Sequence, residues 1–276
     1  MLLVGVAAGC STSHPVADAG TLDGGDVPSD PSDGCDAEPT YPTGTSTDAL
    51  THDGLDRTFR VHVPPGSDGR ARPVVVMFHG GGGSGAQLEN ASSRMDVIAD
   101  REGFVTVYPD GTGAIRTWNG DGCCGSAAAS DVDDVGFVSA LLDHLEATLC
   151  VDRRRIFAAG MSNGAILTHR LACSLADRLA AVAPVAGTDM TSTCTPTRPI
   201  PIMQIHGSDD GHVPWEGGLG CGPANVAFTS VPTTIARWQS RNGCASTSTR
   251  SLAEGDGFCE RSDDCDADVV LCTVEG

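Results

Sequence analysis

Short apolar runs alternate along the chain with longer stretches in which apolar residues recur every three or four positions. The short runs, many of them β-branched, predict buried strands, and the helical period predicts amphipathic helices. Because the two patterns follow one another in turn, we expect an α/β fold with a mostly parallel sheet and helices on both faces. The predicted strands cover 58–63 (antiparallel), 73–78, 104–108, 156–159, 180–184 and 200–205, and the predicted helices cover 88–102, 134–150, 163–176 and 233–242.

Composition divides the chain into three regions. Residues 1–10 are small and apolar and end in Cys10, which resembles a bacterial lipoprotein signal whose cysteine is lipidated and tethered to a membrane. A truncated ordinary signal peptide is the alternative, because no basic residue precedes the apolar stretch. Residues 11–45 are rich in Asp, Pro, Gly and Ser and predict a disordered acidic linker. Residues 46–276 carry the periodic segments and predict one domain.

The charge balance is strongly acidic, with a formal net charge of −19 and a pI of about 4.5. This surplus argues against binding to nucleic acid and against electrostatic docking on anionic lipid. It suits a neutral or weakly anionic substrate.

Twelve cysteines are too many for a reducing cytosol and predict disulfides in an exported protein. No paired C-x-x-C spacing with histidines is present, so a zinc site is not expected. No other metal and no cofactor is predicted. Without Cys10 the count is odd, which leaves a free thiol or a partner lost with a missing C-terminal segment. Cys259 and Cys265 would close a short surface loop, whereas Cys123 and Cys124 pair either with each other or with separate partners.

The sequence Gly160-Met161-Ser162-Asn163-Gly164 lies between a predicted strand and a predicted helix. A strand, a G-x-S-x-G turn and a helix together form the context of a nucleophile elbow, in which a sharp turn exposes the serine hydroxyl. The flanking glycines fit because a Cβ would clash in so tight a bend. A plain glycine turn is the alternative.

Two further segments follow predicted strands and suit acyl-transfer chemistry. The glycine loop after His79 can present a backbone N–H to a developing oxyanion, paired with the N–H of Asn163. Asp209 and Asp210 follow the strand at 200–205, at the edge where open α/β sheets place functional groups. A flexible surface loop and a solvated turn, respectively, are the alternatives.

A base for the serine is harder to find. His169 lies on the helix after the elbow and is expected to point away from the hydroxyl, and His206 is expected to hydrogen-bond locally. His212 is too close in sequence to Asp210 to sit between that acid and Ser162 without strain. None of the three histidines after Ser162 is therefore a convincing general base.

Several segments, taken in order, resemble the secreted polyhydroxybutyrate depolymerase and feruloyl esterase family of α/β-hydrolases. The resemblance covers roughly residue 56 to the end of the chain and implies the α/β-hydrolase fold. The matching segments are His79-Gly80 with its glycine loop, 118–125 with Cys123-Cys124, 133–137, the elbow, 171–173, 181–187 and 206–215.

Residue by residue, the resemblance implies Ser162 as nucleophile, Asp210 as acid, and the N–H groups of Gly81 and Asn163 as the oxyanion hole. It also suggests Trp118 and Trp215 as substrate-binding residues, although a core role for Trp118 is nearly as plausible. The implied protein is an extracellular serine esterase that forms an acyl-enzyme. Its substrates would be polyester (polyhydroxyalkanoate) or plant-wall esters (feruloyl or acetyl-xylan).

The family's base lies in a Gly-Gly-His-x-Trp-Pro segment directly after its last strand, which here corresponds to 269–274. By resemblance, the chain stops just before this histidine, so we expect a C-terminally incomplete domain that has little activity as written. The alternative is a non-catalytic protein of hydrolase fold that binds polyester or polysaccharide.

Overall fold

The computed structural model describes residues 31–38, 40–66 and 70–276. A ten-stranded sheet runs through this part of the chain in the order β1-β2-β4-β3-β5-β6-β7-β12-β11-β10. The six strands from β4 to β12 in that order pair in parallel, and the two strands at each edge pair antiparallel. The strands are β1 (Gly44–His52), β2 (Leu55–Val63), β3 (Arg72–Phe78), β4 (Val105–Pro109), β5 (Val151–Met161), β6 (Ala181–Val185), β7 (Ile202–Gly207), β10 (Ser248–Glu254), β11 (Gly257–Ser262) and β12 (Val269–Val274).

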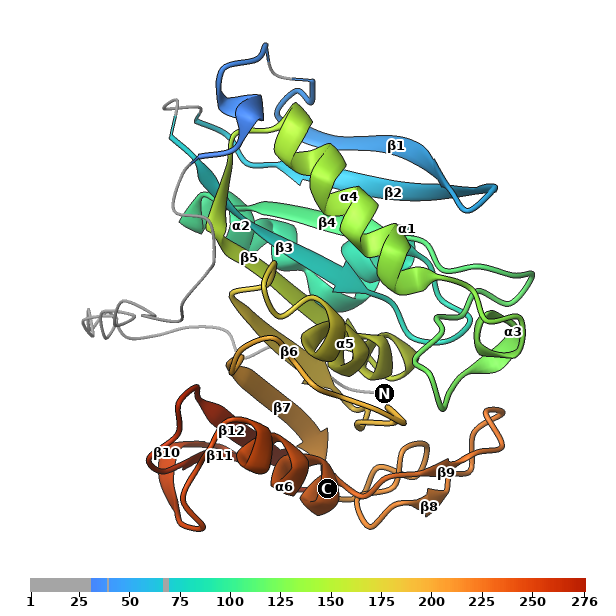
Figure 1. Cartoon of the computed structure of the whole chain (residues 1–276), viewed down its shortest axis with the longest axis vertical. Helices are drawn as coiled ribbons and strands as arrows, with labels where there is room; N and C mark the ends of the chain where they lie inside the picture. The colour runs from blue at the N-terminus through green and yellow to red at the C-terminus, as the bar shows by residue number, and fades with distance from the viewer. Residues whose placement is uncertain (1–30, 39, 67–69) are drawn as a thin grey trace.

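Helices cover both faces of this sheet. Figure 1 shows α4 and α5 in front of it, and α1 and α2 behind. The predicted α/β-hydrolase architecture, with a parallel centre flanked by helices, is therefore confirmed. The helical segments are η1 (Asp33–Cys35), α1 (Gly85–Gln87), the π-helical turn η2 (Leu88–Ser93), α2 (Met95–Glu102), α3 (Gly125–Ala129), α4 (Asp134–Thr148), α5 (Asn163–Ser174) and α6 (Val231–Arg241), and the short strands β8 (Gly218–Leu219) and β9 (Ala227–Phe228) form a separate pair.

Each predicted strand and helix is present, with ends that differ by a few residues. The helix expected over 88–102 is interrupted, because Arg94 takes a left-handed conformation (φ 52°) between η2 and α2. Strands β1, β10 and β11 were not predicted from the apolar pattern. In β1 the side chains alternate between half-buried and exposed, so no fully buried apolar face marks it in the sequence.

The expected linker over 11–45 is wrong for residues 31–38 and 40–45, the part of it that the structure describes. Cys35 forms a disulfide with Cys150, and Tyr41 is buried in the main hydrophobic core. Ser32 is buried as well, and its hydroxyl donates to the Leu149 carbonyl at 2.7 Å. One disulfide and one aromatic ring thus order a segment that lacks an apolar run. The predicted signal remnant at 1–10, Cys10 and residues 11–30 lie outside the described residues.

The structure contains five disulfides among the described cysteines, in keeping with the expectation from composition. Cys123 and Cys124 pair with each other, which settles one open alternative. The predicted Cys259–Cys265 bridge is wrong, because Cys259 faces Cys272 across the β11–β12 pairing and bonds to it. The remaining bridges are Cys35–Cys150, Cys173–Cys194 and Cys244–Cys265, and Cys221 is a free, exposed thiol.

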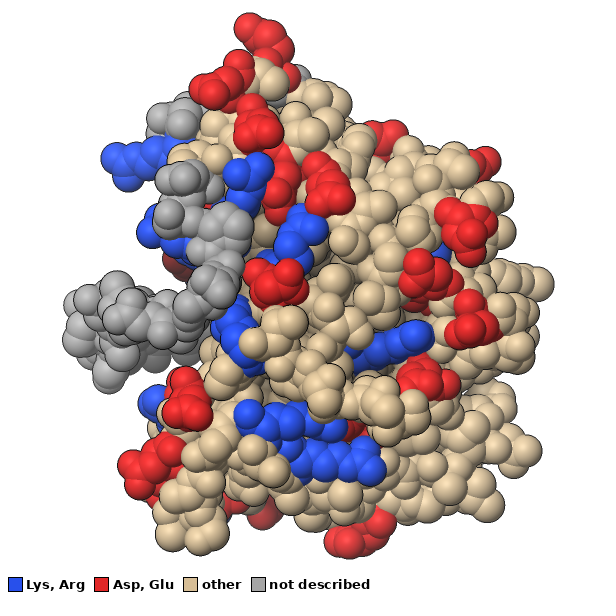
Figure 2. All heavy atoms as spheres, viewed as in Figure 1, with Lys and Arg blue, Asp and Glu red and all other residues tan. Residues whose placement is uncertain are grey.

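Acidic side chains spread over much of the face seen in Figure 2, with arginines in smaller groups among them. On that face the negative surplus is therefore dispersed. Within the described part of the chain, no helix is long and apolar enough to cross a membrane.

Candidate active site

Ser162 stands alone between the end of β5 and the start of α5, with φ 54° and ψ −119°. A positive φ is uncommon for serine and costs on the order of 1–3 kcal/mol, so the surrounding structure must hold it. The Ser162 N–H donates to the Val185 carbonyl at 2.8 Å, and the Ser162 carbonyl accepts from Ala165 at 2.9 Å. The strand–turn–helix context expected of a nucleophile elbow is thus present.

The two elbow glycines are sterically required. A Cβ on Gly160 would overlap the Gly164 carbonyl, and a Cβ on Gly164 would overlap the Phe78 carbonyl at the end of β3. Gly187, on the far side of the turn, would place a Cβ 2.7 Å from the Cβ of Ala165. The elbow therefore packs backbone against backbone on both sides, and this close packing explains the glycines directly.

The glycine loop after β3 lies against this elbow. A Cβ on Gly80 would come within 3.4 Å of the Ser162 Cβ, and one on Gly81 within 3.8 Å of the Asn163 Cβ. Asn163 is the first residue of α5, and the first N–H groups of a helix have no acceptor within it. The structure therefore brings Gly81 close to Asn163, beside Ser162; their role as an oxyanion hole stays a prediction.

Side-chain hydrogen bonds fix the glycine loop relative to the helix. The Asn163 side chain accepts from the Trp118 N–H at 2.7 Å and donates to the Trp118 carbonyl at 2.9 Å. The Trp118 indole N–H donates to the His79 carbonyl at 2.9 Å. Asn163 thus offers its main chain to the site while its side chain ties three segments together.

His79 braces the same loop as a neutral imidazole. Its Nδ1–H donates to the Gly80 carbonyl at 2.7 Å, and its Nε2 accepts from the Gly111 N–H at 2.9 Å. Burial lowers the pKa of His79, which favours this neutral form. Both ring nitrogens are therefore engaged by backbone, and His79 acts as a structural residue.

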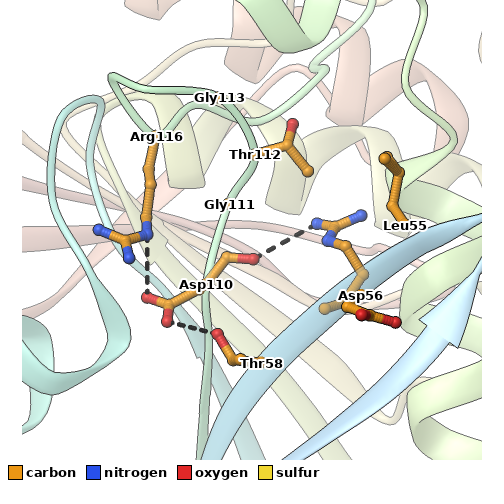
Figure 3. A pocket seen from close by; sticks show the side chains of 9 residues that line it. Leu55, Asp56, Thr58, Asp110, Gly111, Thr112, Gly113 and Arg116 are labelled. Atoms are coloured by element: carbon orange, nitrogen blue, oxygen red, sulfur yellow. Dashed lines mark hydrogen bonds and ion pairs between the residues drawn. The ribbon is translucent and has the colours of Figure 1, made fainter.

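Asp110, directly after β4, anchors the loop from behind. Its carboxylate accepts from the Gly85 N–H and from the Thr58 hydroxyl, both at 2.8 Å. The Arg116 guanidinium lies 3.8 Å from the same carboxylate. Figure 3 shows Thr58 and Arg116 pointing toward Asp110 at the border of a cavity of about 260 Å³. Asp110 therefore connects strand β2 to the far end of the glycine loop.

The loop that follows β7 carries Asp210. One of its carboxylate oxygens accepts from the N–H groups of His212, at 2.8 Å, and Val213, at 3.0 Å. The second oxygen lies 3.6 Å from the His206 Nε2, too far for a good hydrogen bond. One face of the carboxylate is thus fixed by its own loop, and its other oxygen can accept a further donor. Asp209 beside it is exposed.

Ser162 and Asp210 follow strands two places apart in the sheet, since β6 lies between β5 and β7. With neighbouring strands about 4.8 Å apart, the two loops leave the sheet edge roughly 10 Å from each other. The sheet thus places both predicted residues in loops at its carboxyl edge.

The family model described as esterase PHB depolymerase matches residues 57–211 of this chain, which is more than half of its length. The protein belongs to this esterase family. The match contains the glycine loop, the elbow and Asp210.

Relatives of this protein include feruloyl esterase B of Piromyces equi, which is 31% identical to it over 229 residues. That alignment covers 78% of this chain and 41% of the relative, so the chain spans less than half the length of that protein. An acetyl xylan esterase from Aspergillus awamori shares the fold, with a TM-score of 0.62 and 15% identity over 84% of this chain and 93% of that one. The LpqC poly(3-hydroxybutyrate) depolymerase of Bordetella parapertussis has a TM-score of 0.54 and 19% identity, covering 72% and 78% of the two chains.

The two tryptophans suggested as substrate-binding residues differ in their surroundings. The Trp118 side chain is fully buried in the core of this esterase-family domain and packs edge-on against Phe78. It has no exposed surface for a substrate to touch, so the expectation of a cleft wall is corrected to a core role. Trp215 is partly buried and lies edge-on to His206, with ring centroids 6.1 Å apart; its substrate-binding role remains a prediction.

The histidines of the described chain are mostly engaged elsewhere. His169 is buried, its Nδ1 accepts from the Trp238 indole at 3.0 Å, and its Nε2–H donates to Gln204 at 3.0 Å. His212 is exposed, and a Cβ on Gly222 would lie 3.1 Å from its ring. The expectation that His169 points away from the hydroxyl fits these contacts.

His206 is likewise used structurally. Its Nδ1 accepts from the Gln204 amide at 3.0 Å, and its Nε2–H donates to the Val213 carbonyl at 2.9 Å. Burial lowers the pKa of His206, so the neutral ring fits both roles. A continuous chain of hydrogen bonds therefore runs from Trp238 on α6 through His169, Gln204 and His206 to the loop that holds Asp210.

The supporting residues Asp110 and Gln204 were missed from the sequence. Gln204 occupies the middle of an apolar strand, where a lone polar residue signals a buried hydrogen-bond partner. Asp110 follows a strand in the same way as Asp210 does. Position after a strand was thus a usable signal for Asp110, but its partners come from segments far away in sequence.

A test of the buried hydrogen-bond chain follows from His169. Burial lowers its pKa from 6.5 to about 4, so the unfolded chain binds a proton at a pH where the folded protein does not. Stability is therefore lost as the pH falls from 6.5 toward 4. The free-energy gap between wild type and His169→Gln should shrink by about 2 kcal/mol between pH 7 and pH 5, measured by urea unfolding.

The comparison of the two proteins cancels the titration of the many carboxylates that they share. An unchanged gap across this range would show that His169 titrates normally and that the chain of hydrogen bonds does not enforce the neutral ring. A second variant, His144→Gln, removes a half-exposed histidine and serves as a control.

Proposed function

We propose that this protein is a serine esterase that cleaves carboxylic esters through an acyl-enzyme at Ser162. The observation that carries the proposal is the elbow itself, in which a serine held at positive φ precedes the first residue of α5 and packs against the glycine loop at Gly80. Acyl transfer needs a nucleophile with backbone N–H donors beside it, here the N–H of Asn163 at the start of α5 and the N–H of Gly81 in the glycine loop.

In the proposed reaction, a base removes the proton from the Ser162 hydroxyl as its Oγ bonds to the ester carbonyl carbon. The N–H groups of Gly81 and Asn163 stabilise the negative charge on the carbonyl oxygen. The C–O bond to the alcohol then breaks, and the protonated base gives its proton to the leaving alcohol. Water, deprotonated by the same base, attacks the acyl-enzyme and releases the acid and free Ser162.

We propose that a histidine placed directly after β12, as in the motif of the family, would act as the base and would be oriented by Asp210. β12 pairs in parallel with β7, and the Ser208 N–H donates to the Val274 carbonyl at 2.9 Å. The Gly276 N–H donates to the Ser208 hydroxyl at 3.3 Å. The end of β12 therefore lies beside Ser208, which precedes Asp210 by two residues in the same loop. On this proposal, a histidine placed there would bridge Asp210 and Ser162.

The substrate class follows from the family and its relatives. We propose carboxylic esters of polyester or plant-wall type, since named relatives are a feruloyl esterase, an acetyl xylan esterase and a poly(3-hydroxybutyrate) depolymerase. The five disulfides of the described residues support an oxidising, extracellular location. A lipid tether at Cys10 remains a separate proposal.

Covalent labelling tests the nucleophile. With the family's histidine segment attached after β12, a small alkyl fluorophosphonate is expected to modify the tryptic peptide 156–170, whose only serine is Ser162, and mass spectrometry locates the adduct. Ser162→Ala should remove the adduct while circular dichroism shows an unchanged fold. A folded protein that stays unlabelled, both alone and with the family's histidine segment attached, yet binds polyester or xylan would favour the non-catalytic alternative.

A further inference from the structure

A cavity of about 200 Å³ opens beside the elbow and has no role in the reaction as described so far. Its walls are the backbone of the glycine loop from Gly80 to Gly83, the Leu88 side chain from η2, and Met161, which immediately precedes Ser162. Ser92 and Gln87 add polar groups, and both are exposed. The cavity therefore combines an apolar wall, a polar rim and the loop proposed to hold the oxyanion.

The order of the strands decides which part of an ester would reach this cavity. In the sheet, β3 lies on one side of β5, whereas β6, β7 and β12 lie on the other. The glycine loop and η2, which follow β3 in the chain, supply walls of the cavity. A leaving alcohol must depart toward the base that protonates it. On the proposed mechanism that base lies on the β7 and β12 side, so the acyl group of the ester must extend toward β3.

We propose that this cavity is the acyl subsite of the enzyme and that it takes short acyl groups of about two to four carbons. The inference rests on the proposed function, because it assumes an ester bonded to Ser162. Pockets for drug-sized ligands measure roughly 300–1,000 Å³, so a cavity of about 200 Å³ holds a small acyl chain, and a longer chain would extend beyond its walls. The polar rim suits a hydroxylated or acetyl group.

Met161 sets the limit of the subsite. Its side chain is 42% exposed although it borders the nucleophile, and its methyl group lies where a Cβ on Gly80 would come within 3.6 Å. Exposure of the apolar Met161 side chain to water is unfavourable. An acyl chain that packs against this side chain would remove that surface from water. Its unbranched, flexible side chain can adapt to chains of slightly different length.

The test is the acyl-chain selectivity of Met161→Ala. The ratio of kcat/KM for p-nitrophenyl hexanoate to that for p-nitrophenyl acetate is expected to rise about 10-fold or more, because a truncated wall admits the longer chain. Since each ratio is taken on one protein, a low absolute rate cancels. Met203→Ala is the matched control, as Met203 is 43% exposed on β7, on the other side of the elbow.

A ratio that stays the same in Met161→Ala, with Ser162 still labelled, would overturn the subsite and leave the proposed function intact. An equal rise in Met203→Ala would overturn it as well. As a second readout, fluorophosphonates with ethyl and hexyl chains should label Ser162 at more similar rates in Met161→Ala than in wild type. Loss of all labelling on the folded protein would instead remove the nucleophile, and with it this inference.

Discussion

A chain extended past β12 by the family's Gly-Gly-His-x-Trp-Pro segment is expected to hydrolyse p-nitrophenyl butyrate about 10²–10⁴-fold faster than the 276-residue chain. The physical reason is that Ser162 needs a proton acceptor on the proposed mechanism. The ring nitrogens of His169 and His206 are hydrogen-bonded to other residues. What remains without the base is the catalysis supplied by the oxyanion hole and by binding. The measurement is kcat/KM on the two proteins side by side.

Two variants give this comparison its controls. An extended chain in which the segment's histidine is replaced by alanine should fall back to the slow rate. His212→Ala in the extended chain should stay near the parent rate, because the His212 ring packs toward Gly222. Equal rates for the short and the extended chains, together with a collapse in His212→Ala, would identify His212 as the base and contradict the proposal.

Asp210→Asn is expected to lower kcat in the extended chain by about 10⁴-fold, the loss seen when an orienting aspartate of a serine triad is amidated. The asparagine would keep the shape of the loop but could present an N–H where the imidazole needs an acceptor. Asp209→Asn is the matched control, since the neighbouring carboxylate is exposed and should leave kcat within about twofold. The rates are followed with p-nitrophenyl butyrate.

Loop stability must be separated from chemistry in this pair. Asp210 accepts two backbone N–H groups within its own loop, so the variant should also be tested by thermal unfolding. The KM is expected to change little while kcat falls. A large effect of Asp209→Asn with a small effect of Asp210→Asn would move the acid by one residue and revise the site.

The parallel core of the fold was predictable because its strands are buried on both faces and read as apolar runs. The edge strands were not, since β1 exposes one face, the described residues of β10 are exposed, and β11 contains the polar residues Glu260, Arg261 and Ser262, so none of them has a comparable apolar run. The ordered segment around Cys35 and Tyr41 was missed for a related reason. Its stability comes from a disulfide and one buried ring, and both partners lie more than a hundred residues away.

The elements of the site were predictable where the chemistry is local. Gly160 to Gly164 specify the turn through steric contacts within a few residues and with one neighbouring strand. The hydrogen-bond partners of the supporting residues Asp110, Gln204 and Trp238 were not predictable, because those partners lie far away in sequence and meet them only in the folded protein. A buried polar residue announces that it needs a partner, but the sequence does not say which one.

Strands β10 and β11 are joined to the rest of the sheet only through β12. The disulfide Cys259–Cys272 links β11 to β12, and Cys244–Cys265 links the loop between them to the segment after α6, so both crosslinks hold this corner of the sheet. Production in a reducing host would leave these crosslinks open and allow the corner to fray. The end of β12 would then lose its fixed position beside the loop of Asp210, so on the proposed mechanism oxidation of these cysteines is a condition for activity as well as for resistance to denaturation.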